Sequence, residues 1–383
     1  MDLAGSVIEQ MKFNWEGVYG QELSKEILSQ LIISNRIPHS FLFNGPNGVG
    51  KHLLSLRFAQ YLNYNNLPEK SSFINNQIAN LTEPFIKYVI PLPRGKNETD
   101  TSGPVEKFNP DEIQELKSEL EKKIKNPYYK ISLTRANIIK ISSIRDIGKF
   151  LSLNYSDVKY RFILISDAHL MNEESQNALL KNLEEPPEGV IFILLTPYPD
   201  LLRETIRSRC WRVNLQPLLN EHINKVLIEY FNISEKIAAD VSPFSDGSVT
   251  KAIELIENDF ENLKEKTISF MRYSLGGKFN SAFNELNLYL IDNDSGSIKL
   301  LIKMIISWLD DILKHRISID EFYFNSHRET IVKFNSKFPD VELNEVIKKL
   351  DYLSSTIRNN INLYVICLNL VFELASLTNR ISK

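Results

Sequence analysis

The residues with the clearest chemical potential form a glycine-rich loop, Gly-Pro-Asn-Gly-Val-Gly-Lys, at residues 45–51. Gly45, four intervening residues, Gly50 and Lys51 match the spacing of a phosphate-binding loop. The glycines, Gly48 among them, let successive backbone N–H groups turn toward one anion, and the lysine ammonium reaches its outer oxygens. The loop therefore predicts a site for a nucleotide or for a bare phosphate.

The residue that follows this lysine breaks the pattern. A serine or threonine hydroxyl normally stands there and ligates Mg²⁺, but this chain has His52. An imidazole nitrogen is a poor substitute, because Mg²⁺ prefers oxygen ligands in near-octahedral geometry. The loop is therefore expected to hold phosphate yet to be badly equipped for magnesium-assisted hydrolysis.

The elements that must position this loop alternate between strand and helix patterns. An apolar strand at 40–44 precedes the loop, an apolar helix follows it, and a helix over 21–35 comes before both. Further strands are predicted at 138–141, 161–167 and 190–196; one helix is expected to be capped by Ser142 or Ser143 and another to begin at Asn172. Apolar runs without alternation are typical of buried parallel strands. The pattern predicts a parallel α/β sheet covered by helices on both faces.

Between these elements lies a stretch of different composition. Residues 63–110 are rich in asparagine and proline and show little periodicity, so we interpret 63–137 as a polar insertion. A charged helix is expected from 110 to about 124, with Asp111 as its N-cap. Its Glu/Lys pattern is most simply a solvated face; contact of Lys122, Lys123 and Lys125 with phosphate is the less favoured alternative.

The remainder of the chain has only helical periodicity. Pro217 ends the α/β part, a small helical unit is expected over 218–258, and 259–383 is predicted to be all-helical. The segment 361–377 is apolar nearly all round, which indicates either a core helix or a helix packed on a partner.

Composition excludes several classes of protein. The 383 residues suggest two or three domains, and a net charge of −3 gives no overall basic field for nucleic acid. Cys210 and Cys367 are the only cysteines, too few for a disulfide framework or a zinc site by themselves. The first residues lack the charge and apolar run of a signal peptide, and no apolar run is long enough to span a bilayer. We expect a cytoplasmic protein in a reducing compartment.

Several motifs together resemble a known family. The loop lies behind Arg-Ile-Pro-His-Ser-Phe-Leu-Phe at 36–43; Asn-Ala-Leu-Leu-Lys-Asn-Leu-Glu-Glu-Pro-Pro fills 177–187; and Ser-Arg-Cys stands at 208–210. This pattern resembles the clamp-loader branch of the AAA+ ATPases, and within it the delta-prime family of bacterial DNA polymerase III. The resemblance is specific over 36–62 and 138–256. It implies an α/β P-loop AAA+ domain at 1–217, a small helical lid at 218–258, and an all-α oligomerisation collar at 259–383.

The resemblance implies a role for individual residues. Lys51 would contact phosphate, and Thr196 stands at the position of the sensor on the fourth core strand. Where ATPase members carry a metal-organising Asp and a catalytic Glu, this chain has Ser166 and Asp167, a degenerate acidic position. Thr250 replaces the arginine of the second sensor; the adjacent lysine would point about a quarter-turn away.

One predicted contact acts on a neighbour. The resemblance assigns Arg209 as an arginine finger that reaches ATP bound by the adjoining subunit, where a guanidinium stabilises charge on the transferred phosphoryl group. Cys210 beside it is interpreted as a small buried hydrophobe rather than a nucleophile. Because 63–137 contains no cysteine, the zinc module of several relatives is not expected, and no metal ligand is predicted.

Three hypotheses follow. In the first, the chain is a delta-prime-like subunit with weak binding of ATP or ADP and absent or weak hydrolysis, because His52, Ser166 and Thr250 have each lost a metal or phosphate contact. Its partners would be the gamma/tau and delta subunits, the sliding clamp and, through the complex, primed DNA, with no membrane. In the second, it is an active gamma/tau-like or other AAA+ ATPase. The third, an unrelated P-loop enzyme such as a nucleotide kinase, is disfavoured by the helical C-terminal third.

Overall fold

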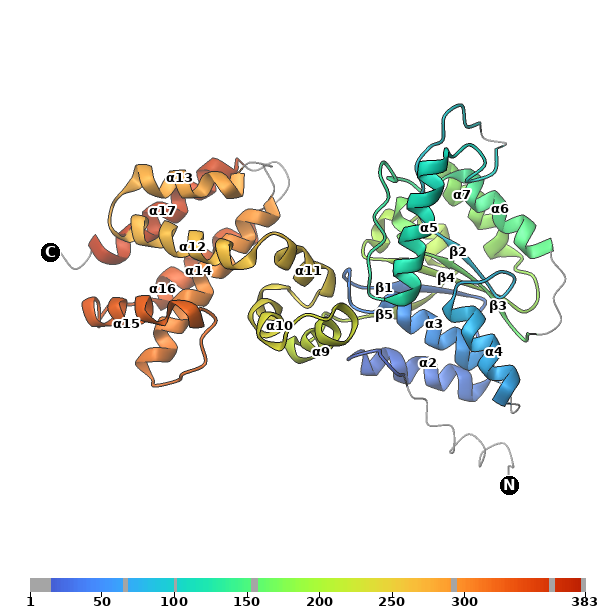
Figure 1. The fold of residues 1–383 in the computed structure, drawn as a ribbon, viewed down its shortest axis with the longest axis horizontal. Helices are drawn as coiled ribbons and strands as arrows, with labels where there is room; N and C mark the ends of the chain where they lie inside the picture. The colour runs from blue at the N-terminus through green and yellow to red at the C-terminus, as the bar shows by residue number, and fades with distance from the viewer. Residues whose placement is uncertain are drawn as a thin grey trace, which may run out of the picture. The chain divides into compact units, whose positions relative to one another are not determined.

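The computed structural model describes residues 15–64, 68–99, 102–152, 158–290, 295–357 and 362–379. The chain divides into two compact units, Met1–Ala252 and Ile253–Lys383 (Figure 1). The start of the chain, where the sequence predicts no signal peptide, lies outside the described residues.

The first unit is built on a parallel sheet of five strands, in the order β2 (Ile86–Val89), β3 (Arg161–Ile165), β4 (Val190–Thr196), β1 (Ser40–Asn44) and β5 (Trp211–Asn214). Every neighbouring pair is parallel, with Phe41 of β1 opposite Ile193 on one side and Trp211 on the other. Since parallel strands end at the same edge, the loop after β1 and the acidic residue after β3 are brought together there.

Helices cover both faces of this sheet: α2 (Glu22–Ser34), α3 (Lys51–Leu62), α4 (Pro68–Ala79), α5 (Pro110–Lys125), α6 (Ile141–Ser152), α7 (Glu173–Glu184) and the short α8 (Glu204–Arg207). Leu42 of β1 packs in one hydrophobic cluster with Ile147 of α6 and Leu179 of α7. The ring of the preceding Phe41 lies 5.1 Å from that of Phe58 in α3, on the other face. Alternate residues of the strand thus bury against opposite helix layers, as the apolar runs predict.

The rest of the chain is helical. The first unit continues with α9 (Asn220–Phe231) and α10 (Glu235–Val241), and α11 (Val249–Glu257) leads into the second unit. That unit contains α12 (Phe260–Leu275), α13 (Phe279–Leu290), α14 (Ser295–Arg316), α15 (Arg328–Lys337), α16 (Asn344–Thr356) and α17 (Leu363–Asn379), with no strand among its described residues. The predicted fold class, a parallel α/β P-loop domain followed by helices, is confirmed.

A buried carboxylate shapes the second unit. Asp311 of α14 is fully buried and accepts backbone N–H bonds from Tyr323 (3.0 Å) and Phe324 (2.9 Å), which close the connection to α15. Within the part of the chain that the structure describes, no helix is both long and apolar enough to cross a membrane. The division at 217 and 258 into three domains stays a prediction.

The polar stretch 63–137 contains more regular structure than its sequence indicates. Residues 68–79 form α4, and residues 86–89 form the edge strand β2, so the interpretation of this part as irregular is wrong. β2 is short and pairs on one side only, with β3, which explains why Lys87 and Tyr88 interrupt its apolar pattern.

Three smaller expectations also fail. The strand predicted at 138–141 is a single bridge between Ile139 and Met171, and α6 already begins at Ile141, so Ser142 and Ser143 lie inside its first turn rather than capping it. In α5 the cap lies earlier than predicted.

The N-cap of α5 is Asn109, not Asp111. Its side chain accepts a hydrogen bond from the N–H of Glu112 (2.8 Å), whose carboxylate accepts one from the N–H of Asn109 (3.0 Å). This reciprocal pair is a capping box, which the proline at the first helical position accompanies.

We expect Asn109→Ala to lower the free energy of opening of α5 by about 1 kcal/mol, because it removes the cap. Asp111→Ala loses only a charge near the positive helix end, worth about 0.3 kcal/mol. Amide hydrogen exchange along α5 measures both. An equal loss of protection in the two variants would contradict the cap assignment.

Candidate functional site

The glycine-rich loop is packed too closely against its neighbours to carry side chains. A Cβ on Gly45 would lie 2.5 Å from the carbonyl oxygen of Leu215, after β5. A Cβ on Gly48, which has a φ of +71°, would lie 2.4 Å from the backbone nitrogen of Thr250 at the start of α11. Gly50 then leads into α3 as its N-cap residue. The loop therefore has the backbone of an anion cradle at the N-terminus of a helix.

Lys51 lies inside this cradle. Its side chain is 9% exposed, and its Nζ donates hydrogen bonds of 2.6 Å to the carbonyl oxygens of both Gly45 and Pro46. Burial lowers the pKa of Lys51 to about 8, against the opposing effect of the negative charge on Asp167. The amine thus remains mostly charged near neutral pH and lies where an anion on the loop would contact it.

Uncharged side chains, those of His52, Tyr88 and Ser166, form a neutral cluster at the position where a metal ligand is expected. His52 is 6% exposed, packs 5.3 Å from the ring of Tyr88, and has no hydrogen-bond partner for its Nδ1. Burial, and secondarily the charge of Lys123, lower the pKa of His52 well below its ordinary value. The hydroxyl of Tyr88 is in turn hydrogen-bonded to Ser166. These groups do not fit Mg²⁺, because no carboxylate or threonine hydroxyl takes the expected ligand positions.

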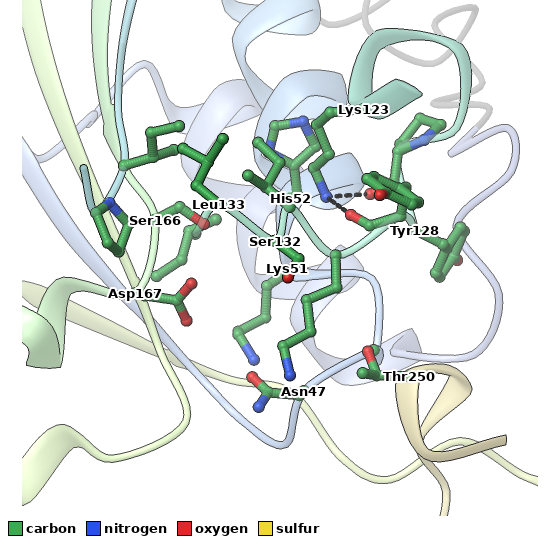
Figure 2. A pocket seen from close by; sticks show the side chains of 18 of the residues that line it. Asn47, Lys51, His52, Lys123, Tyr128, Ser132, Leu133, Ser166, Asp167 and Thr250 are labelled. Carbon is green, nitrogen blue, oxygen red and sulfur yellow. Dashed lines mark hydrogen bonds between the residues drawn. The ribbon is translucent and has the colours of Figure 1, made fainter. Parts of the chain in front are cut away.

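Asp167 follows β3 in a left-handed conformation (φ 51°) and lines the same cavity as Lys51. It is the one acidic residue among the described residues of that lining, which also includes Lys123 and Lys130. Figure 2 shows its carboxylate on the same side of the cavity as Ser166, across from Tyr128. The cavity, about 340 Å³ in volume, is therefore cationic overall and suits an anion.

One wall of the cavity comes from residues that no sequence motif marks. Residues 127–133, after α5, line it beside the glycine-rich loop (Figure 2). Lys123 is 8% exposed, and its Nζ donates bonds of 2.7 Å to the carbonyl oxygens of Pro127 and Tyr129. The interpretation of α5 as a purely solvated face is wrong at this residue. Burial lowers the pKa of Lys123 to about 7, opposed by Asp167 and reinforced by Lys51.

The two predicted sensor positions differ in their surroundings. Thr196 is fully buried at the end of β4, and its Oγ1 accepts a hydrogen bond from the N–H of Tyr198 (3.0 Å) instead of lining the cavity. Thr250 does line the cavity. The adjacent Lys251 forms an ion pair with Asp246 and is absent from the lining, so it does not replace the missing arginine.

Arg209 lies at the opposite end of the strands from the glycine-rich loop, beside the first residue of β1. Its backbone oxygen accepts a hydrogen bond of 2.7 Å from the hydroxyl of Ser40, the first residue of β1, whereas the glycine-rich loop follows the last. The five residues of β1 separate the two edges by about 15 Å at 3.3 Å per residue. The Arg209 side chain is 37% exposed, and its guanidinium donates a hydrogen bond to the carbonyl oxygen of Thr205 (2.9 Å) and pairs with Glu184 (3.0 Å). Arg209 is thus out of reach of the cavity in its own chain.

Cys210 beside it agrees with the expected buried hydrophobe. It is 7% exposed, and burial raises the pKa of its thiol to about 11, which leaves it protonated and unreactive. Among the residues that the structure describes, no three histidine, cysteine or acidic side chains gather closely enough to hold a metal ion.

Comparison with known proteins consistently relates this chain to subunits of DNA polymerase III. The family described as "DNA polymerase III, delta subunit" matches residues 20–219, more than half of the chain. The tau subunit of DNA polymerase III from Bacillus subtilis is 28% identical over 251 residues, which are 63% of this chain and 37% of that protein. The gamma subunit from Buchnera aphidicola subsp. Baizongia pistaciae is 26% identical over 337 residues, covering 86% of this chain and 78% of the relative.

A delta′ subunit also matches. The delta′ subunit of DNA polymerase III from Escherichia coli is 28% identical over 162 residues, which cover 42% of this chain and 48% of that protein. The matched region therefore spans less than half of the length of the B. subtilis and E. coli relatives.

The buried lysines give a pH-dependent stability that can be measured. An unfolded lysine has a pKa near 10.4, whereas burial lowers that of Lys123 to about 7. Between these values the unfolded chain binds one proton more, so the free energy of unfolding rises with pH, by up to about 1.4 kcal/mol per pH unit.

One buried lysine contributes a rise in the free energy of unfolding with pH. We expect Lys123→Met to remove most of that rise between pH 7.5 and 9.5, measured by urea denaturation at several pH values. Lys117→Met is the control, because Lys117 is an exposed lysine of the same helix. The raised pKa of Cys210 affects all variants equally and cancels in the comparison. If the free energy of unfolding changes with pH in the same way in wild type and Lys123→Met, burial does not destabilise the ammonium of Lys123.

Proposed function

We propose that this chain, which belongs to the DNA polymerase III delta subunit family, is a delta-prime-like subunit of the clamp loader in DNA replication. In this proposal it hydrolyses little or no ATP itself and supplies Arg209 to ATP held by a neighbouring subunit. The observation that carries the proposal is the position of Arg209, exposed at the edge of the sheet opposite Lys51.

The cavity of the chain itself supports the first half of the proposal. Efficient phosphoryl transfer requires a bound metal ion and a positioned base or water. Here His52 and Ser166 belong to a neutral cluster, and Thr250 supplies no positive charge. The phosphate cradle is kept, so weak binding of ATP or ADP, without efficient turnover, is the expected behaviour.

The surroundings of Arg209 support the second half. An exposed ion pair such as the one with Glu184 contributes only about 0–1 kcal/mol, so it is readily exchanged for a stronger partner. A guanidinium binds phosphate oxygens in a bidentate manner, and in other phosphoryl-transfer enzymes a finger supplied by a neighbour speeds turnover about 10³–10⁵-fold.

The second unit offers a surface for assembly. In α17, Leu370 and Leu374 are buried, while Tyr364, Val365, Leu368 and Phe372 are 40–60% exposed and follow one another at helical spacing. The helix therefore has a core face and a second apolar face. We assign this second face, with residues 259–383, to the contact with gamma/tau and delta subunits, which would hold the ring that loads the sliding clamp on primed DNA.

A gamma/tau-like ATPase is the second candidate, and the tau and gamma relatives favour it. It requires magnesium-dependent ATP turnover by the isolated chain, abolished by Lys51→Ala. The purified chain, assayed alone and with a gamma-type partner, separates the two candidates.

In the reconstituted clamp loader, we expect Arg209→Ala to lower ATP turnover several-fold, because one neighbouring site loses its finger, while assembly stays intact. Arg203→Ala is the matched control: Arg203 is 41% exposed nearby in the sequence and is also paired with an acid, Glu173. Steady-state ATPase activity and gel filtration provide the measurements. Unchanged turnover in an intact complex would rule out the finger role.

We further expect Phe372→Asp to weaken assembly at least tenfold, because a charge would be buried in the apolar contact of α17. Val332→Asp, at an exposed apolar position of α15, is the control. Circular dichroism checks that both variants fold, and titration with the partner subunits measures affinity. Wild-type affinity in Phe372→Asp would exclude this face from the contact.

A further inference from the structure

The segment after α5 is not used by the proposed function, although it forms a wall of the cavity. We call residues 126–137 the strap. Within it, Tyr128 is 5% exposed; its hydroxyl donates to the carbonyl oxygen of Gly17 (2.9 Å) and accepts from the N–H of Tyr19 (3.5 Å). A Cβ added to Gly50 would lie 3.2 Å from the same hydroxyl. Tyr128 therefore fills the space directly beside the glycine-rich loop.

Contacts with α9 and α5 hold the first part of the strap. The side-chain amide of Asn126 donates to the carbonyl oxygen of Tyr230 in α9 (2.8 Å), and the rings of Tyr128 and Tyr230 lie 5.2 Å apart. The two bonds from Lys123 to strap carbonyl oxygens add charge-assisted anchors (Figure 2). Tyr128 is thus enclosed between the loop, the segment before α2 and α9.

Carboxylates of α5 hold the second part. Glu119, 5% exposed, accepts hydrogen bonds from the N–H of Ser132 (2.8 Å) and from the hydroxyl of Tyr129 (2.9 Å). Glu115 accepts one from the N–H of Thr134 (2.9 Å). Because the strap is bonded at both ends, displacing Tyr128 requires several of these interactions to break together.

The space that remains beside the loop suits an anion better than a nucleoside. The cavity is about 340 Å³ in volume, near the lower limit of about 300 Å³ for ligand pockets. Its lining carries Lys51, Lys123 and Lys130 against the single carboxylate of Asp167, and the loop adds its backbone N–H groups. A ribose and base that extend from phosphate in the direction of Gly17 and Tyr230 would meet Tyr128.

We propose that the strap makes this loop selective for inorganic phosphate chains, such as pyrophosphate and tripolyphosphate, and that Tyr128 is the residue that excludes the nucleoside. To admit a nucleotide, the chain must give up the hydrogen bonds of Tyr128 and expose its ring. The loss of these hydrogen bonds and of the ring's burial is expected to weaken binding by roughly 100-fold or more. Selectivity therefore resides in the strap rather than in the cradle.

The test is calorimetric titration of the full chain with tripolyphosphate and with ATP, both with EDTA present so that metal plays no part. The wild type should bind tripolyphosphate, lose at least tenfold affinity in Lys51→Ala, and bind ATP about 100-fold more weakly. Equal affinity for the two ligands, no binding of tripolyphosphate, or binding that survives Lys51→Ala would each overturn the proposal. These comparisons need no change in the strap, so they hold whether or not a strap variant folds.

The strap itself is tested by Tyr128→Ala. ATP affinity should rise at least tenfold, while affinity for tripolyphosphate stays within about twofold of wild type. Tyr352→Ala, which removes a 70% exposed tyrosine of α16 outside the cavity lining, is the control and should change neither. An unchanged ratio of the two affinities in a folded Tyr128→Ala protein would refute the role of Tyr128. The role of Arg209 is independent of this outcome, because a chain that binds ATP can still supply a finger to its neighbour.

Discussion

Because all five strands run in the same direction, the sheet has two chemically different edges, and this constraint organises the first unit. Every carboxyl end faces the cavity edge, where the glycine-rich loop follows β1 and Asp167 follows β3. Every amino end faces the opposite edge, where Ser40 holds the backbone of Arg209. One strand therefore connects a phosphate cradle at one end to an exposed guanidinium at the other. Neither group can serve the other within one chain, which is why the proposed chemistry of Arg209 needs a second subunit.

Two buried ammonium groups lie beside the cavity. Lys51 and Lys123 are both removed from water, and each is held by two backbone carbonyl oxygens and by the field of Asp167. Carbonyl dipoles and one carboxylate compensate only part of the desolvation cost, as the lowered pKa of each lysine shows. An additional anion would complete the compensation. The same cavity thus has a structural reason to attract an anion.

Sequence patterns predicted what depends on local spacing. The loop at 45–51, the apolar strands β1, β3 and β4, the cap at Asn172 and the helical C-terminal third all follow from turn chemistry and periodicity, and the structure has them. The strand β2 was not predicted, because a strand that pairs on one side only need not be apolar. The apolar run at 138–141 was predicted as a strand but forms only a single bridge at Ile139, because a short apolar run need not pair. Tyr128 was missed, and Lys123 was named only as part of a less favoured phosphate contact, for a different reason: no motif marks either residue, and only the packing of α5 and the strap beside the loop brings them to the cavity.

The neutral cluster of His52, Tyr88 and Ser166 couples these three positions to one another. A carboxylate placed at Ser166 alone would stand beside a phenol and an unprotonated imidazole, while the ammonium groups of Lys51 and Lys123 in the same cavity lining are already bonded to carbonyl oxygens. A hydroxyl restored at position 52 alone would leave a void where the imidazole packs. The cost of each change depends on the other positions, which lie on separate segments of the chain. Converting this loop to magnesium binding therefore requires coupled substitutions at more than one position rather than a single exchange.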